Sequence, residues 1–429
     1  MKQSSSPHIM ILPSEPYVPA GNHMLGIFQK DQVALLKESG YRLSVLSVRG
    51  ITRPGLAKSF MLRLSGRKRA FLSELNTLDL FILGVLSLFR ISWQKKMQID
   101  GVDVYKSFYV SRSPRMYDKK NFLRWVKVAR KAFRKWGNIA GQPDLIHAHN
   151  AFFAGYTAST LQETFSVPYV LTEHSSAYGR KLVPDSFFPL IKKGIQNAQS
   201  LITVSPSLAR DVESSFPEDA ISFDWIPNVL DRRFEQAHIL PNPDEGFRFI
   251  CVGRMDENKN FQLVLNAFAE IAANNPQVSL DFVGTGPMED VLKEHAISLE
   301  LQGRVHFHGF MSRDKVVELM QSADCLVLSS NYETFGVVVI EAHALGKPTI
   351  ATQCGGPDSI IQPHNGTLVP PRDLPAMAAA MQKMIHATHY ESHAIRQQCL
   401  DRFGTEAIRQ ALVQQYQSVL QQQPAIPHA

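Results

Sequence analysis

The chain has 429 residues, a length that predicts two domains rather than a single core. Its 44% hydrophobic and 20% charged residues are typical of a soluble globular protein. The four cysteines form no C-x-x-C pair, which argues against a disulfide framework and a zinc knuckle and fits a reducing compartment. The first apolar run is too short for a signal peptide, so we expect a cytoplasmic protein.

The net charge of +6 is unevenly distributed along the chain. Residues 1–140 contain 25 Lys and Arg but only 8 Asp and Glu, so the remainder of the chain is net acidic. Such an asymmetry predicts that the N-terminal part faces an anionic partner.

Short apolar segments in the first half alternate with helical stretches, which is typical of parallel α/β sheets. The first strand, HIMIL, precedes the loop PSEPYVPAGNHMLG and the helix IFQKDQVALLKESG. Further strands are predicted at YRLSVLSVRG, PDLIHAHN, PYVLTEHS and SLITVS. The basic segments 56–99 and 115–137, with apolar residues at helical spacing, look like additions to a minimal Rossmann domain.

The segments DWIPNVLD and ILPNPDEGFR indicate a linker near 230–243, after which the pattern restarts. Strands follow at FRFICVGRM, VSLDFVGTG, RVHFHGF, DCLVLSS and KPTIAT. We therefore predict two doubly wound, Rossmann-like domains, 1–235 and 240–405. A final helix over about 408–429 is expected to pack back on the first domain.

Three consecutive valines, Val337–Val339, favour a strand by propensity. The flanking strands DCLVLSS and KPTIAT lie only sixteen residues apart. A right-handed crossover between parallel strands usually contains a helix. We therefore predict a helix over Phe335–Leu345 that ends at Gly346, with the valines buried on the sheet.

The start of that helix follows a strand at its carboxyl end, where open α/β sheets bind ligands. The amides of Phe335, Gly336 and Val337 would be free donors for a phosphate in the first turn. Glu333 and Glu341 look like separate hydroxyl acceptors on one polar ligand. Alternatively, Glu333 is a capping acid and Glu341 a partly exposed helix residue.

A second phosphate signal is VGRMDENKN, where Arg254 follows a strand and Lys259 comes five residues later. Both cations suit an anion held at a helix N-terminus. A solvated loop is the alternative, but the position at the end of a strand favours a binding role. The Gly loop VGTGP, which contains Gly284, is a weak signal by itself.

Together these motifs resemble the family-4 retaining glycosyltransferases of the GT-B fold, whose two domains face each other across a cleft. The resemblance rests on GRMDENK, VGTGP, ETFGVVVIEAHALGKP and GGPDSII in the second half. In the first half, PAGNHMLG, HAHN, LTEHSS, VSPS and IPNVLD occur in the order that the family shows. The resemblance covers nearly the whole chain.

The resemblance implies a donor site for a nucleotide-diphosphate sugar, such as a UDP- or GDP-sugar. Arg254 and Lys259 would hold the diphosphate, and the amides of Phe335–Val337 would complete that cradle. Glu341 would accept from the ribose hydroxyls. Glu333 would contact the donor sugar near the reacting centre.

Further positions of this donor site are carried over from the same resemblance. Gly21 would let the first loop approach the diphosphate, Gly284 belongs to the second Gly loop, and the nucleobase would pack near Phe310. His174 would face the donor sugar across the cleft. The chain departs from the family at Asn22, where many members have a second glycine, and in GGPDS, where Asp358 comes one position early.

The HAHN segment allows two interpretations. His147 and His149 alternate on a strand end and could form a metal cluster with Glu173 and His174. The favoured interpretation places His149 on the acceptor side of the cleft or in a hydrogen bond under a loop.

The resemblance also implies the reaction. The sugar would pass with retention to a hydroxyl of a saccharide, which we expect to be lipid-linked, in polysaccharide biosynthesis, and neither a metal nor another cofactor is expected. A nucleotide-sugar epimerase of the same fold and a non-catalytic binding component of an assembly complex are the alternatives. The donor sugar, the nucleobase and the acceptor stay open.

The basic N-terminal helices also have two interpretations. They could lie at an anionic membrane surface on the inner face, with Arg63, Arg67, Lys68 and Arg69 among the contacts. Alternatively, they are core-packed helices with solvated basic faces. No nucleic-acid-binding motif accompanies the charge, so nucleic acid is not an expected partner.

Overall fold

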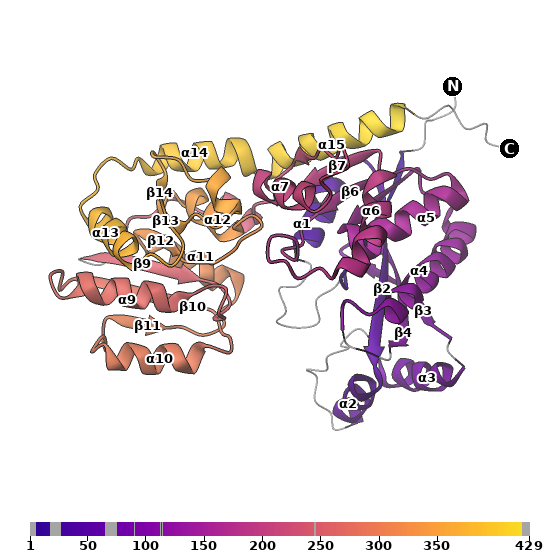
Figure 1. Cartoon of the computed structure of the whole chain (residues 1–429), viewed down its shortest axis with the longest axis horizontal. Coiled ribbons are helices and arrows are strands. Elements are labelled where there is room, and N and C mark those ends of the chain that lie inside the picture. Colours follow the sequence, from indigo (N-terminus) through magenta and orange to yellow (C-terminus); the bar gives the residue numbers. More distant parts are fainter. Residues whose placement is uncertain are drawn as a thin grey trace.

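The structure is a computed structural model that describes residues 6–17, 27–64, 75–89, 91–111, 113, 115–243 and 246–422. It contains two sheets, each covered by helices, in two halves of the chain that lie side by side (Figure 1). Gly21 lies outside the described residues, as do the side chains of the basic cluster formed by Arg63, Arg67, Lys68 and Arg69.

The N-terminal sheet has eight strands in the order β3-β4-β2-β1-β5-β6-β7-β8. All neighbouring strands are parallel except β3 and β4. The strands are β1 (His8–Pro13), β2 (Arg42–Thr52), β3 (Trp93–Ile99), β4 (Val102–Ser111), β5 (Leu145–His149), β6 (Tyr169–Glu173), β7 (Ser200–Thr203) and β8 (Asp224–Trp225). The predicted strands of this half are therefore confirmed.

The antiparallel hairpin β3–β4 was not predicted from the sequence. The segment 56–99 was assigned to helical additions, and this assignment is wrong for its last seven residues, which form β3. The turn consists of Asp100 and Gly101, both with positive φ (51° and 75°). Asp-Gly is the preferred dipeptide of such two-residue turns, so the signal was present in the sequence.

The C-terminal sheet has six parallel strands in the order β11-β10-β9-β12-β13-β14. Its strands are β9 (Phe247–Val252), β10 (Val278–Val283), β11 (Val305–Phe307), β12 (Cys325–Leu328), β13 (Thr349–Thr352) and β14 (Gly366–Val369). The strand order reverses between β9 and β12. Open α/β sheets bind ligands beside such a switch point, at the carboxyl ends of the strands.

Helices connect the strands and cover both sheets (Figure 1). They are α1 (Ile27–Lys37), α2 (Arg53–Leu64), α3 (Thr77–Leu88), α4 (Lys119–Ala140), α5 (Tyr156–Phe165), α6 (Phe188–Gln196), α7 (Pro206–Ser214), α8 (Arg232–Gln236), α9 (Phe261–Ala272), α10 (Glu289–Ser298), α11 (Arg313–Gln321), α12 (Val337–Ala344), α13 (Leu374–Ile385), α14 (Ser392–Phe403) and α15 (Thr405–Gln421). None of the described helices combines the length and apolar character needed to cross a membrane.

The valine-rich segment forms a helix, as predicted, although α12 starts at Val337 rather than at Phe335. Gly346 follows its end with φ of 72°, a left-handed conformation that glycine adopts without strain. Val339 is fully buried and the two preceding valines are half-buried. Packing against the core therefore overrides the poor helix propensity of these residues.

The long helix α4 packs its apolar face onto β2 and β4, so the core-packed interpretation holds for this segment. Its buried residues include Phe122, Trp125 and Phe133, and Tyr105 of β4 stacks on Trp136 at 4.6 Å. All the charged residues of α4 are Lys or Arg; most of them are exposed, whereas Arg124 and Arg130 are half-buried and Arg124 lies over the ring of Tyr109.

The last described helix, α15, runs from the C-terminal sheet back across the N-terminal sheet (Figure 1). Ile408, Leu412, Tyr416 and Val419 share a hydrophobic cluster with residues of β1, β2 and α1. The chain thus crosses between the two halves twice, near α8 and between α14 and α15.

Candidate functional site

The loops that follow β9 and β12 are joined by hydrogen bonds at the switch point of the C-terminal sheet. The amide of Asn331 donates to the carbonyl of Asn258 at 2.7 Å, and the side chain of Asn258 donates to the carbonyl of Tyr332 at 3.0 Å. The hydroxyl of Ser329 donates to the carbonyl of Lys259 at 2.8 Å. These bonds fix the two loops against each other.

This arrangement brings together two residues that lie 74 positions apart in the sequence. The ammonium group of Lys259 donates to Oε1 of Glu333 at 2.5 Å, and the hydroxyl of Ser330 donates to the same oxygen at 2.7 Å. Burial disfavours the charged form of Lys259, but the carboxylate of Glu333 more than offsets it and raises the pKa of Lys259. Lys259 is therefore held as a cation in the site.

Arg254 stands at the rim of the same site. Its side chain is 70% exposed, and its guanidinium lies 3.5 Å from the carboxylate of Asp256. The other oxygen of Asp256 accepts from the amides of Asn258 and Lys259, both at 3.1 Å, and thereby shapes the loop. Arg254 thus leaves its guanidinium available to a ligand from solution.

Two glycines allow the neighbouring loops to approach this point. A Cβ at Gly284, whose φ is 128°, would lie 1.9 Å from the carbonyl oxygen of Gly253. A Cβ at Gly356 would lie 2.2 Å from the Cα of Phe335. Any side chain at either position would displace the loop that carries Arg254 or the turn that carries Glu333.

The GGPDS segment supports the turn that carries Glu333. The amide of Glu333 donates to the carbonyl of Cys354, and the amide of Gly356 donates to the carbonyl of Glu333, both at 2.8 Å. The carboxylate of Asp358 accepts from the amide of Gly355 at 3.4 Å. Asp358 thus acts within its own turn, despite coming one position earlier than in the family pattern.

The start of α12 presents backbone donors beside Glu333. Gly336 precedes the helix with φ of 94°, and no side chain caps this end. The amides of the first turn of an α-helix have no intrahelical acceptor and attract anions. The ring of Phe335 is buried and meets Phe403 edge-on, so Phe335 and Val337 can contribute only their backbone amides to a ligand in this position.

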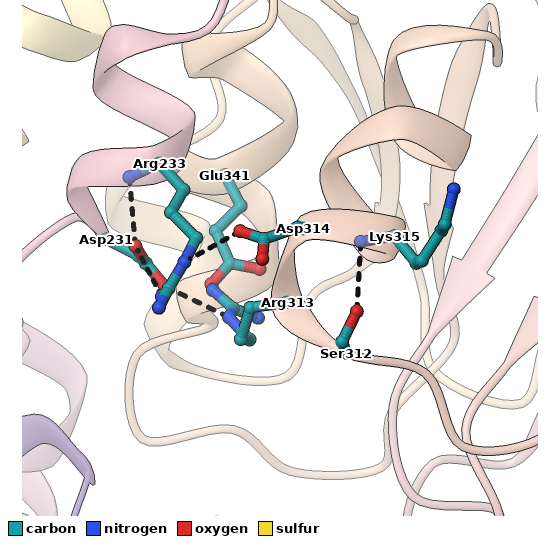
Figure 2. A network of polar contacts seen from close by, with 7 residues as sticks. All are labelled: Asp231, Arg233, Ser312, Arg313, Asp314, Lys315 and Glu341. Atoms are coloured by element: carbon teal, nitrogen blue, oxygen red, sulfur yellow. Dashed lines mark hydrogen bonds and ion pairs between the residues drawn. The ribbon is translucent and has the colours of Figure 1, made fainter.

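Glu341, on α12, lies in a second polar network that includes Asp231 and Arg313 (Figure 2). The guanidinium of Arg313 donates to Oε1 of Glu341 and, at 3.0 Å, to Asp231. Burial raises the pKa of Glu341 against the opposing effect of Arg313. Glu341 is only 4% exposed, so the alternative of a partly exposed helix residue is wrong.

The N-terminal half approaches this network through α1. Burial, and then the charge of Asp231, raise the pKa of Asp31 to about 7. Asp31 also lines a cavity of about 310 Å³ with residues of the linker and α8. Asp31 therefore adds a third carboxyl group near Arg313, beside Asp231 and Glu341, and Asp231 also accepts from the guanidinium of Arg233 at 3.1 Å (Figure 2).

Sequence reasoning missed Arg313 and Asp231. Asp231 lies in IPNVLD, which was read as part of the linker. Arg313 follows Ser312, whose hydroxyl caps α11 by accepting from the amide of Lys315. That helix start comes directly after the strand RVHFHGF, and a search of every strand end for cations could have found Arg313.

Phe310 lies in the loop between β11 and α11. Its side chain is half exposed, and the preceding carbonyl of Gly309 accepts from the amide of Gly284 at 2.9 Å. The loops after β9, β10 and β11 therefore form one continuous edge. Phe310 is the exposed aromatic residue at the end of that edge.

On the N-terminal side, β5 and the residue that follows β6 contribute three histidines whose rings are neighbours. His147 is bonded through its ring nitrogens to the hydroxyls of Tyr416 at 2.6 Å and Thr172 at 2.7 Å. His149 and His174 are joined at 3.0 Å. His149 is fully buried and hydrogen-bonded, which agrees with the interpretation of a residue bonded under a loop, and its place on the acceptor side stays a prediction.

Glu173 holds the loop that carries His174. Its carboxylate accepts from the amides of Ala151, His174 and Ser175 at 2.8–2.9 Å. Among the described residues, no group of three His, Cys, Asp or Glu is arranged to hold a metal ion. Of the three histidines, only His174 is partly exposed, and it follows β6 at the carboxyl edge of the N-terminal sheet.

The two halves meet directly beside Glu333. The hydroxyl of Tyr332 donates to the carboxylate of Asp211, on α7, at 2.6 Å. A Cβ at Gly179 would lie 2.2 Å from the ring of Tyr332. A Cβ at Gly355 would lie 3.0 Å from the hydroxyl of Ser207, at the start of α7. The turn that carries Glu333 is therefore in contact with the opposite half.

The buried histidines predict loss of stability in mild acid. Burial lowers the pKa of His147, which is fully buried, to about 3, below the unfolded value of about 6.5. Between these values the unfolded chain binds more protons, so the free energy of unfolding should fall as pH drops below 6.5. For each such histidine, the free energy of unfolding should fall by about 1.4 kcal/mol per pH unit.

Denaturant unfolding between pH 4 and pH 8 measures this effect. His147→Gln should show a shallower acid slope than wild type. Tyr416→Phe is the matched control, because it removes the hydrogen bond but keeps the imidazole, and should keep the slope. An unchanged slope in His147→Gln would contradict the prediction.

Two family profiles match successive parts of the chain. The profile described as Glycosyltransferase Family 4 matches residues 93–234, and the one described as Glycosyl transferases group 1 matches residues 232–398. The chain belongs to the family-4 glycosyltransferases. Membership assigns nucleotide-sugar-dependent glycosyl transfer to the protein, as the sequence motifs predicted.

Similar proteins agree with this assignment. The glycogen synthase of Mycobacterium tuberculosis (strain CDC 1551 / Oshkosh) is 26% identical over 67% of this glycosyltransferase and 72% of the relative. Sucrose-phosphate synthase from Thermosynechococcus elongatus is 20% identical, with a TM-score of 0.72 over 97% of this chain and 100% of that chain. Anabaena Alr3699/HepE, solved in complex with UDP, is 18% identical. Its TM-score is 0.65 over 96% of this chain and 99% of that chain. The predicted GT-B fold is confirmed.

Proposed function

We propose that this glycosyltransferase moves a sugar, with retention, from a nucleotide-diphosphate sugar to a hydroxyl of a saccharide in polysaccharide biosynthesis. The observation that carries the proposal is the contact between Lys259 and Glu333 at the switch point of the C-terminal sheet. In this proposal Lys259 would be the cation for the diphosphate, and Glu333, which it contacts, would be the carboxylate for the sugar. The UDP complex of the similar Anabaena protein supports a nucleoside diphosphate as the ligand.

In this proposal the protein acts mainly by stabilising the leaving diphosphate. Lys259, Arg254 and the amides at the start of α12 would neutralise the charge that develops as the glycosidic bond breaks. Retention requires that the acceptor attack from the face that the diphosphate leaves, so a phosphate oxygen can take the proton of the acceptor hydroxyl. These groups supply the required charge, and the proposed reaction needs no metal ion.

The remaining site residues would position the donor. Glu341 would accept from the ribose hydroxyls, with Arg313 holding its carboxylate in place. Phe310 would lie beside the nucleobase. Glu333 would contact the sugar, and His174 would contact it from the opposite half of the chain.

We further propose a lipid-linked saccharide as the acceptor and a peripheral position of the enzyme at the inner face of a membrane. The excess of Lys and Arg in residues 1–140 supports this location, because membrane surfaces rich in anionic lipids attract basic segments. The acidic C-terminal half would then bind the soluble donor away from that surface.

A donor screen tests the proposed reaction. Wild-type enzyme is incubated with UDP- and GDP-sugars and with lipid-linked saccharide acceptors, and release of the nucleoside diphosphate is measured together with the glycosylated product. At least one pair should give acceptor-dependent release with retained configuration at the anomeric carbon. A released free sugar epimer or free nucleotide sugar would instead indicate an epimerase. Absence of turnover with tight nucleotide-sugar binding would indicate a binding component.

A further inference from the structure

Helix α3 exposes an apolar face at one end of the N-terminal half. Leu78, Phe81, Val85 and Leu88 recur at spacings of three and four residues, so they lie along one side of the helix. The side chains of Leu88 and of Phe89, which follows it, are 74% and 71% exposed. The opposite side of α3 is anchored by buried Leu80 and Leu83. Large aligned apolar side chains in contact with solvent mark an interaction surface.

A basic groove lies next to this apolar face. A cavity of about 530 Å³ is formed between the start of α4 and the residues that lead into β3. Ile91 and Leu123 contribute exposed apolar groups to it. Four cations from a single face of α4 also line the cavity: Lys120, Arg124, Lys127 and Lys131.

Few carboxylates lie among the described residues around the groove. Helix α4 contains eight Lys and Arg and no Asp or Glu. Asp118 lines the groove, but its carboxylate accepts from the amide of Asn121 at 2.7 Å as the N-cap of α4. Asp79, on α3, forms an ion pair with Lys95 at 2.8 Å. Among the described residues, no ion pair involves Lys120, Lys127 or Lys131.

We propose that the apolar face of α3 and the groove of α4 form one docking surface for a bilayer that contains anionic phospholipids. The head-group phosphates would enter the groove beside the lysines, and the apolar side chains of α3 would insert at the boundary between head groups and acyl chains. This combination favours a bilayer over nucleic acid, because a nucleic acid backbone offers no partner for five exposed apolar side chains. It also favours a bilayer over a soluble anion, which would leave that face in water.

The position of the surface agrees with this role. Helices α2 and α3 lie at the end of the N-terminal half that is remote from α15 (Figure 1). Docking there leaves the loops at the switch point of the C-terminal sheet open to solvent, so that a soluble donor can enter. Docking at this surface would bring the enzyme to a lipid-linked acceptor. Only this purpose of docking rests on the proposed function.

Vesicle flotation without nucleotide or acceptor tests the surface by itself. Full-length wild-type protein should float with vesicles of phosphatidylglycerol and phosphatidylcholine in equal parts, and should not float with phosphatidylcholine alone. Added salt should release it, because exposed charges are screened within about 10 Å at 0.1 M. Inorganic phosphate at the same ionic strength should release no more than chloride does. Specific release by phosphate would point to a soluble anion and overturn the proposal.

Variants locate the contact. Lys127→Gln with Lys131→Gln should weaken vesicle binding by about 30-fold, since each cation near an anionic surface adds about 1 kcal/mol. The control is Lys192→Gln with Lys193→Gln, which removes the same charge from α6, on another helix of the same half. Equal losses in the two pairs would show that only net charge matters and would overturn the docking surface.

A fluorescent variant tests insertion. Leu88→Trp keeps an apolar side chain at the most exposed position of α3 and should retain binding. Its emission should shift to shorter wavelength with anionic vesicles and should be quenched by brominated lipids. An unchanged spectrum in bound protein would overturn insertion of α3. Failure of the proposed transfer reaction would leave these vesicle results unaffected, so the two proposals fail separately.

Discussion

Lys259→Ala is expected to reduce turnover by about 10²–10³-fold, because it removes a cation from the leaving diphosphate. The side chain of Lys259 is only 20% exposed, it is bonded to Glu333, and its loop is fixed by contacts of Ser329 and Asp256. Its position is therefore set before a ligand arrives, and no solvent rearrangement is needed to form the contact. Arg254→Ala should cause a loss in the same range, since the exposed guanidinium of Arg254 would bind the same diphosphate from the edge of the site.

Steady-state assays of nucleoside diphosphate release with the best donor–acceptor pair measure both losses. Lys383→Ala is the control. This exposed lysine lies on α13, a helix that covers the same sheet, and is outside the site. Circular dichroism confirms that the variants remain folded. If Lys259→Ala and Arg254→Ala turn over at rates near those of wild type and Lys383→Ala, the assignment of the diphosphate site is wrong.

The two glutamates should separate into two functions. Glu341→Gln should weaken binding of the free nucleoside diphosphate by about 10–100-fold, because a hydrogen bond to a charged acceptor contributes about 1.5–3 kcal/mol. Glu333→Gln should mainly slow transfer and leave the affinity for the free nucleotide little changed, because its proposed partner is the sugar. Isothermal titration calorimetry with UDP and GDP measures the affinities, and single-turnover assays measure the transfer step.

The network around Arg313 calls for a specific control in this experiment. Glu341→Gln also removes a partner from Arg313, so reduced affinity could arise from a displaced guanidinium. Asp231→Asn perturbs the same guanidinium from the other side and leaves Glu341 in place. A loss of affinity in Asp231→Asn as large as that in Glu341→Gln would assign the effect to the network and not to a ribose contact.

The contact between Lys259 and Glu333 predicts that Glu333→Gln will also change the pH dependence of activity. Glu333 raises the pKa of Lys259 against the opposing effect of burial. In Glu333→Gln this support is lost, so the pKa of Lys259 should fall and its charge should be lost at lower pH than in wild type. The alkaline limb of the activity profile should therefore move to lower pH. An alkaline limb at the wild-type position would show that Lys259 keeps its charge without Glu333.

Local patterns in the sequence were sufficient to predict the architecture. The alternation of short apolar runs with helical segments predicted most of the parallel strands, although it missed β4, β8 and β14, and the sixteen-residue spacing identified α12 in spite of its valines. Arg254, Lys259 and Glu333 could be proposed because each lies in a loop that follows a strand, and strand ends meet at one edge of a parallel sheet. These conclusions depend on chain neighbours, which a sequence displays.

Contacts between distant segments were decided by the tertiary structure alone. The sequence does not show that Arg313 lies between Glu341 and Asp231, that Tyr332 reaches Asp211 or that Tyr416 of α15 bonds His147. His149 illustrates the same limit, because the sequence allowed either a place on the acceptor side of the cleft or a hydrogen bond under a loop, and only the structure shows that its neighbours bury it completely. A polar side chain takes whichever partner the packing of helices and sheets brings within about 3 Å. That choice depends on the arrangement of whole elements, and local composition does not contain it.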